Sequence, residues 1–298
     1  MANTLTNMQS RIFADAAIRK FNDILMPLAA ISTSFESEAK HRGDTVRVPV
    51  FPTLTASAFS GDYSASDKTI TGVDVSIDQH YFSSVAITDR ERDESLADYF
   101  TNLGQQEAKA VAKQILTGVM STITAAAFGN NAGDKLVVAS SAFTAESIAD
   151  LRGKAVKKGI PAGDAAIVLG PDYYVALLKD TTLNAGALGS PQAVQDGKIA
   201  RLFGFNNIFE CNFVPGNSEN LVGFVCSRQA LATAIRYLAP QSTAGLADAG
   251  MVSDNESGLT LGVRVIPHPL AGKVHYVTEC LWGHKALDGA ALVRILSA

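Results

Sequence analysis

Apolar residues at the start of the chain recur with the period of a helix. From Ser10 to about Ile31 they fall on one side, while charged residues fill the other positions. We therefore expect an amphipathic N-terminal arm. Pro27 removes a backbone donor and its ring clashes with the preceding turn, so the helix is expected to kink or end near Met26.

The period then changes to that of strands. Residues 45–50 alternate between apolar and polar after a turn at Gly43-Asp44, and residues 73–88 alternate again. Between them, residues 51–72 are rich in small and polar types but keep β-prone ones. This pattern predicts two paired strands that carry a long projecting loop.

The most helical part of the chain follows. Residues 95–128 are rich in Ala, Gln, Leu and Lys, and their apolar positions form one stripe that only Gly104 and Gly118 weaken. The charged cluster 89–94 precedes this helix, and its alternating signs are typical of a solvated helix entrance. We expect one long helix that packs on a sheet and ends at the Gly-Asn-rich turn 129–133.

Strands and helices alternate in the middle of the chain, and strands dominate its end. The Gly/Ser/Pro-dense loop 184–197 interrupts the alternation, and the segment 241–258 is expected to be flexible. The expected helices are 144–159, 173–179 and 228–235, and the expected strands are 165–169, 207–213, 221–226, 259–267, 273–284 and 290–296.

Composition narrows the function classes. The 298 residues are 47% hydrophobic and 18% charged with a formal net charge of −4, which favours a folded chain over a disordered or nucleic-acid-coating one. Three scattered cysteines do not suit a disulfide framework. Because neither a secretory leader nor a membrane-spanning apolar run is visible, we expect the protein to be made in the cytoplasm and to have no membrane partner.

The sequence contains few candidates for a catalytic or metal-binding site. The five histidines lack metal-site spacing, although His275 and His284 flank Glu279 in one expected strand, and the common nucleotide and hydrolase motifs are absent. Cys226 precedes an expected helix start, which would lower its pKa, so a soluble hydrolase that uses this thiol stays an alternative. The alternative interpretation, a small buried residue that ends a strand, is favoured, and we expect no cofactor or metal.

The order of elements resembles the major capsid proteins of tailed phages, which have the Hong Kong 97-type fold. The resemblance rests on the arm, GDTVRVPVFPTLTA, the loop with GDY, DQHYFSSVAITDRE, the long helix, GPDYYVALL and KIARLFGFNNIFECNFVP. It implies an α+β fold and a shell protein, not an enzyme, that self-assembles into the icosahedral capsid around the double-stranded DNA of a tailed phage. An encapsulin-like nanocompartment shell stays a second alternative.

The resemblance also implies a domain organisation. An N-terminal arm is followed by a peripheral domain with an extended loop, the E-loop, and a long spine helix, then by an axial domain and by terminal strands that return to both domains. The implied ranges are 1–42 for the arm, 43–136 for the peripheral domain with the E-loop at 51–72 and the spine helix at 95–128, 137–240 for the axial domain and 241–298 for the terminal strands.

Self-assembly into pentamers and hexamers implies subunit contacts. An isolated hairpin is only marginally stable, so the apolar side chains of the E-loop are expected to lie on a neighbour. Other implied partners are a separate scaffolding protein, a portal, a decoration protein and non-specifically contacted DNA; the mild acidity would keep the lumen from trapping phosphates. Lys68 is the only lysine of the loop, and no cross-link is predicted. The candidate contact residues are Phe21, Leu25, Phe51, Leu54, Phe59, Asp62, Tyr63, Lys68, Ile70, Arg90 and Arg92.

Overall fold

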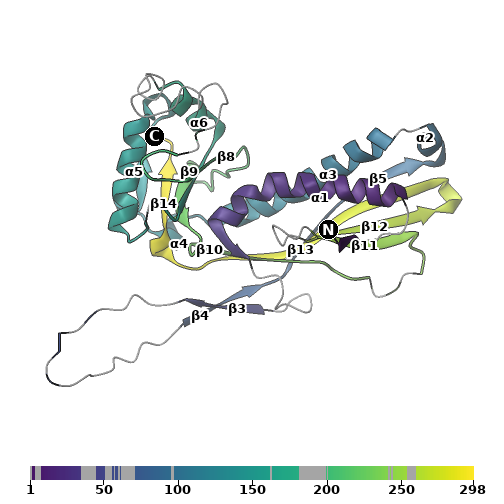
Figure 1. Ribbon diagram of the computed structural model, residues 1–298, viewed down its shortest axis with the longest axis horizontal. Coiled ribbons are helices and arrows are strands. Elements are labelled where there is room, and N and C mark those ends of the chain that lie inside the picture. Colours follow the sequence, from purple (N-terminus) through teal and green to yellow (C-terminus); the bar gives the residue numbers. More distant parts are fainter. Residues whose placement is uncertain are drawn as a thin grey trace.

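The molecule is elongated, with a long sheet-and-helix body at one end and a compact α/β unit at the other (Figure 1). A two-stranded hairpin lies outside both parts. The computed structural model describes residues 2–3, 8–34, 45–50, 56, 58–59, 61, 71–94, 97–161, 163–180, 199, 201–240, 242, 244–253 and 260–298.

The long body is built on a seven-stranded sheet. Its strands follow the order β1-β11-β12-β13-β10-β2, and β5 pairs with the other edge of β13. All neighbours are antiparallel except β10 and β2, which are parallel. The strands are β1 (Ala2–Asn3), β2 (Ser32–Ser34), β5 (Gln79–Thr88), β10 (Leu231–Arg236), β11 (Asp248–Ser253), β12 (Thr260–His268) and β13 (Lys273–Ala286).

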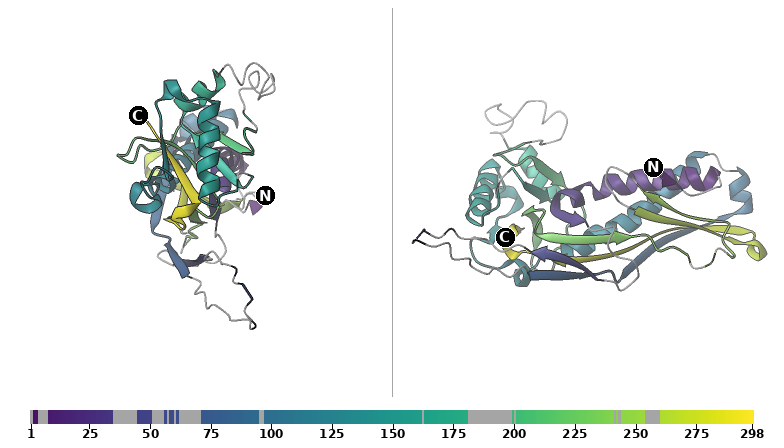
Figure 2. Two further views of the ribbon diagram at one scale, coloured as in Figure 1. Left: turned by 90° about the vertical axis from the view of Figure 1, so that its left-hand side faces the viewer. Right: turned by 60° about the horizontal axis from the view of Figure 1, so that its bottom comes forward.

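Two long helices, α1 (Met8–Ile31) and α3 (Ala97–Ser121), cover one face of this sheet (Figure 2, right). They approach closely because Gly104 has no side chain: a Cβ there would lie 2.4 Å from the backbone oxygen of Phe13. Gly118 plays the same part toward the sheet, since a Cβ there would lie 2.1 Å from the Trp282 ring. The two glycines that weaken the helical pattern of α3 are therefore the positions where α3 comes closest to α1 and to the sheet.

The helix α1 does not end at the proline. Of the two outcomes expected near Met26, a kink or an end, the end is therefore wrong. The helix continues through Pro27 to Ile31. A proline inside a helix costs about 3 kcal/mol, but Leu28 and Ile31 beyond it are buried in the main core. Burying two such side chains contributes about as much as the proline costs.

Phe21 and Leu25 also correct an expectation. Both are fully buried within this chain, in the core that α1 shares with α3 and the sheet. Their side chains have no surface to offer a neighbouring subunit, so their assignment as subunit contacts is wrong. The reason is geometric, because an amphipathic helix packs its apolar stripe on whatever core is nearest, here the chain's own.

The predicted single helix 95–128 is divided. The charged cluster forms its own short helix α2 (Asp89–Glu94), and α3 is followed by α4 (Ala125–Phe128) after a break. At the break the Asn217 side chain donates to the carbonyl oxygens of Met120 and Ile123 at 2.9 and 2.8 Å, and Glu219 accepts from the Ala125 N–H. Side chains from a distant turn thus satisfy the groups that the helix ends expose.

The compact unit holds a five-stranded sheet in the order β6-β14-β9-β7-β8. The C-terminal strand β14 lies between β6 and β9, so the last strand of the chain pairs with one that begins at Lys135. Its strands are β6 (Lys135–Val137), β7 (Ala165–Leu169), β8 (Asn207–Glu210), β9 (Leu221–Ser227) and β14 (Leu292–Leu296). The remaining helices are α5 (Ala145–Lys157) and α6 (Pro171–Leu178), with the 3-10 turns η1 (Ser140–Ala142) and η3 (Gly289–Ala291). A further 3-10 turn, η2 (Pro269–Ala271), joins β12 to β13 in the large sheet.

Two expectations for the second half are wrong. The helix expected over 228–235 is strand β10, whose residues 231–235 are all buried beside β13. The segment expected to be flexible, 241–258, contains strand β11, which pairs with β12. In both places tertiary pairing overrides local composition, because alanine and glycine are accepted in a strand that other elements bury.

The hairpin outside the two sheets consists of β3 (Thr45–Val50) and β4 (Thr71–Ser76). The expected return strand 73–88 is divided at Ile77 and Asp78: β4 pairs with β3, and β5 joins the large sheet. Gly283 of β13 allows the crossing, since a Cβ there would lie 2.0 Å from the Ser76 backbone oxygen. The predicted pairing of residues 45–50 with the start of the return strand is confirmed. The rest of the return strand belongs to the large sheet.

Candidate interaction surfaces

The β3–β4 hairpin is the stem of the predicted E-loop. It is anchored by a small apolar cluster in which Val46, Val48 and Val75 pack against Ala234 and Leu281. Antiparallel pairing runs from Thr45↔Ser76 to Val50↔Thr71, so the two strand ends that bound residues 51–70 lie beside each other.

One candidate contact residue of the loop can be placed. Phe59 is 65% exposed. The others lie outside the described residues, and their contacts stay predictions; they are Phe51, Leu54, Asp62, Tyr63, Lys68 and Ile70.

The remaining candidates lie in the short helix α2 at the far end of the body. Arg90 is exposed, and Arg92 belongs to the same helix. The helix start is stabilised by a capping box: the N–H and hydroxyl of Thr88 donate to the Glu91 carboxylate at 2.9 and 2.8 Å, and the Glu91 N–H donates back to the hydroxyl. The Thr88 N–H bond, then the hydroxyl bond, lowers the pKa of Glu91.

The outer strand β5 presents aromatic side chains that the sequence reasoning missed. Phe82 is 65% exposed and Tyr81 is 39% exposed. Among the described strands, β5 pairs only with β13, so no described strand lies along its other edge. Alternation in the sequence marked this segment as a strand, but its position at the sheet edge follows only from the pairing.

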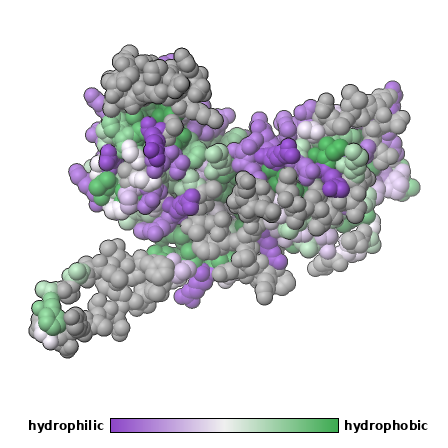
Figure 3. All heavy atoms as spheres, viewed as in Figure 1, coloured by the Kyte–Doolittle hydropathy of each residue, from purple (hydrophilic) through white to green (hydrophobic). Residues whose placement is uncertain are grey.

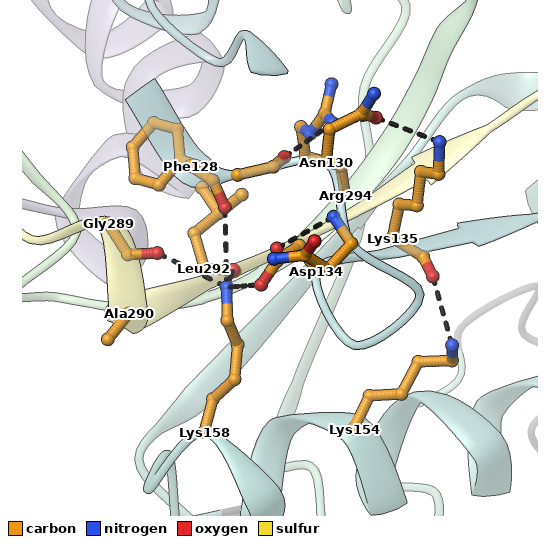
Figure 4. A network of polar contacts seen from close by, with 12 residues as sticks. Phe128, Asn130, Asp134, Lys135, Lys154, Lys158, Gly289, Ala290, Leu292 and Arg294 are labelled. Carbon is orange, nitrogen blue, oxygen red and sulfur yellow. Dashed lines mark hydrogen bonds and ion pairs between the residues drawn. The ribbon is translucent and has the colours of Figure 1, made fainter. Parts of the chain in front are cut away.

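A polar network joins β14 and α5 of the compact unit to the segment that follows α4 (Figure 4). Arg294 of β14, with 1% of its side chain exposed, forms an ion pair with Glu219 and donates to the Gly129 carbonyl at 2.7 Å. Lys158 of α5 lies 2.9 Å from Asp134 and donates to the Leu292 carbonyl at 2.8 Å. The bond from Lys158 lowers the pKa of Asp134.

A buried carboxylate, that of Glu279, lies on the sheet face opposite the helices. Glu279 pairs with Arg264, and His80 lies 3.1 Å from its other oxygen. The Arg264 guanidinium also donates to the Leu238 carbonyl at 2.9 Å, which holds the crossing from β10 to β11 against the sheet. These are interactions that join strands; His275 and His284 do not take part in them.

The candidate chemistry is not assembled into a reactive site. Cys226 is fully buried in β9, and burial raises the pKa of its thiol far above the ordinary value, so it is no nucleophile and the hydrolase alternative loses its residue. The His275 ring contacts His268 at 4.4 Å between centroids, and His284 stacks on Trp282. Within the described part of the chain, no three metal-ligating side chains converge.

The comparisons with known proteins agree with this geometry. The profile of the family described as "Phage capsid protein" matches residues 79–266, more than half of the chain. The chain belongs to this phage capsid family. The capsid protein thus shares a family whose members are structural proteins of the virion shell, not enzymes, and the matched range contains α3 and most of both sheets.

Solved structures share the fold of this capsid protein. The capsid of the cyanophage P-SCSP1u aligns at TM-score 0.60 and 17% identity over 90% of this chain and 86% of that one. Mycobacterium phage Che8 aligns at 0.52 and 17% over 92% and 90%. A virus-like particle from Pyrococcus furiosus aligns at 0.55 and 14% over 96% and 98%. The fold is therefore of the Hong Kong 97 type, as the order of elements predicted.

Two further findings complete the picture of the capsid protein. No curated protein sequence matches it. Among its described helices, none combines the length and apolar character needed to cross a membrane.

Proposed function

We propose that this capsid protein is the building block of an icosahedral tailed-phage shell, in which copies form pentamers and hexamers around double-stranded DNA. Family membership carries the proposal. The elongated body with a hairpin at its side supports it, because head-to-tail contacts between identical chains close into rings.

The E-loop, residues 51–72, supplies the second element of the proposal. It would lie on a neighbouring subunit, where its apolar side chains are removed from water. Each such contact is modest, but a closed shell repeats it many times and becomes collectively stable. The exposed Phe59 side chain supports this arrangement.

The domain ranges complete the proposed arrangement. We propose 1–42 as the arm, 43–136 as the peripheral domain, 137–240 as the axial domain near the symmetry axes, and 241–298 as the strands that join them. The compact α/β unit, which contains α5, α6 and the five-stranded sheet, supports the axial range. Its loop 184–197, a candidate for contacts at the axes, lies outside the described residues.

Assembly is proposed to take place in the host cytoplasm with other phage proteins. A separate scaffolding protein would guide curvature, a portal would occupy one vertex, and a decoration protein would bind outside. These partners are supported by the capsid family alone.

The test is electron microscopy of the protein expressed alone and together with its neighbouring genes. We expect closed icosahedral shells, or capsomer rings and tubes. A field of small compact particles under both conditions contradicts the proposal. Shells that contain a cargo enzyme and no DNA would instead establish a nanocompartment.

A further inference from the structure

The outer side of the α1–α3 helix layer carries an excess of positive charge, and Figure 3 shows hydrophilic side chains gathered there. Among the side chains of this layer whose exposure the structure describes, five cationic and two anionic ones are exposed or half-buried. The whole chain has a formal charge of −4, so the rest of it, outside these seven side chains, carries −7. The seven side chains are those of Arg11, Asp15, Arg19, Lys20, Asp23, Lys109 and Lys113.

Four exposed cations of the layer lie on two adjacent helices. Arg11 and Arg19 are eight residues apart on α1, about 12 Å along its axis, and Lys109 and Lys113 are one turn apart on α3. Both helices run from the α2 end toward α4 (Figure 1), and the contact at Gly104 brings them together. We call these four residues the basic strip.

The described acidic side chains of the same layer are fewer than its cations. Asp23 is exposed and Asp15 half-buried, while Glu107 of α3 is 5% exposed and faces the sheet. Duplex DNA carries one negative charge per about 1.7 Å of axis, so a strip of this length meets several phosphates. Four cations give weak and sequence-independent contact, which leaves DNA free to slide.

We propose that the basic strip faces the shell interior and contacts the phosphates of packaged duplex DNA. This rests on the proposed function of the chain as a DNA-enclosing shell. It also assigns the two faces of the body: the helix layer is lumenal, and the face of the sheet that carries Glu279 points away from the DNA.

The test compares two full-length variants with the same loss of charge. One replaces the strip by R11Q/R19Q/K109Q/K113Q; the control replaces four exposed cations elsewhere by R152Q/K157Q/R201Q/K285Q. Binding of unassembled protein to a labelled 20-base-pair duplex is followed by fluorescence anisotropy across NaCl concentrations. We expect the strip variant to lose at least tenfold in affinity at low salt and its salt slope to fall by about 2 to 4, with a several-fold smaller change in the control.

Equal losses in the two variants would overturn the proposal, because net charge alone would then explain binding. An unchanged strip variant would overturn it as well. Loss of binding to a co-expressed acidic scaffolding protein, with DNA binding intact, would assign the strip to that protein instead. Microscopy of the wild type separates the two proposals: shells that form while the strip variant binds DNA normally refute only the strip, whereas the absence of shells refutes the shell function.

Discussion

Single residues decide where the parts of this capsid protein meet. Gly104, Gly118 and Gly283 each lie where a Cβ would meet another atom at 2.4 Å or less. In the sequence they read as weak points of a helix or strand, since glycine lowers the propensity of both. Glycine is needed at these positions because elements far apart in the chain come into contact there. Such contacts cannot be predicted from a local sequence pattern.

Replacing Gly283 by valine should displace the β3–β4 hairpin. The new Cβ would lie 2.0 Å from the Ser76 backbone oxygen, and backbone cannot move aside as a side chain can. We expect a loss of about 1–3 kcal/mol in the free energy of unfolding, measured by urea denaturation, and failure to form shells. Gly153→Ala in α5, where nothing lies within 4 Å, is the matched control and should be neutral or stabilising.

Glu107 should make stability depend on pH. Burial, opposed by weaker interactions with Thr278 and Val85, raises its pKa from 4.5 to about 8. Between these values the unfolded chain has released the proton and the folded chain keeps it, so stability falls as pH rises, by up to about 1.4 kcal/mol per unit. Glu107→Gln should remove this slope, and denaturation at pH 5 to 8 measures it. Parallel curves for the two proteins would refute the assignment.

Arg294 should be the costliest residue of the polar network. Arg294→Ala removes the cation that pairs with Glu219 and empties a buried site, so we expect a loss of about 3–5 kcal/mol. The control is Lys135→Ala, which removes an exposed bond to Asn130 in the same network and should cost less than about 1 kcal/mol. Equal effects in thermal denaturation would mean that burial of Arg294 is unimportant.

The long elements owe their stability to each other. The helix α1 contains Pro27 and spans 24 residues, and it survives because Phe13, Phe21 and Leu25 are buried against α3 and the sheet. Propensity alone favours an earlier end. The helix is therefore a tertiary element, and separation from α3 should unfold it.

Gly104→Ala tests this dependence. The added methyl group would lie 2.4 Å from the Phe13 carbonyl oxygen and should push α1 away from α3. We expect faster hydrogen exchange at the backbone amides of α1, while β13 and β14 stay protected. Uniformly faster exchange would show instead that the body unfolds as one unit.

For the whole molecule, we expect the fold not to need residues 51–70, which lie beyond the β3–β4 stem. β3 and β4 are joined at Val50↔Thr71, so replacement of residues 51–70 by Asn-Gly would close a two-residue turn on an existing pair. We expect the variant to fold with unchanged thermal stability and to lose stable shells in electron microscopy. If its shells resist heat and denaturant like the wild type, the E-loop is not the element that joins subunits.

Pattern and composition were enough to predict most of the elements, and the resemblance that their order carries predicted the class of this protein. Apolar periodicity located α1, α3, α5 and most strands, and the low charge with no catalytic motif indicated a structural role. These features are local, because the spacing of apolar residues that marks a helix or a strand is set by residues close together in the sequence.

Only the tertiary structure decided how these elements share their surfaces. It buried Phe21 and Leu25 inside the chain, turned 228–235 into a strand, and divided 73–88 between a hairpin and a sheet. It also gathered the basic strip from two helices. Each outcome depends on a partner distant in sequence, and the free energy of burying the two together exceeds the preference that either segment has alone.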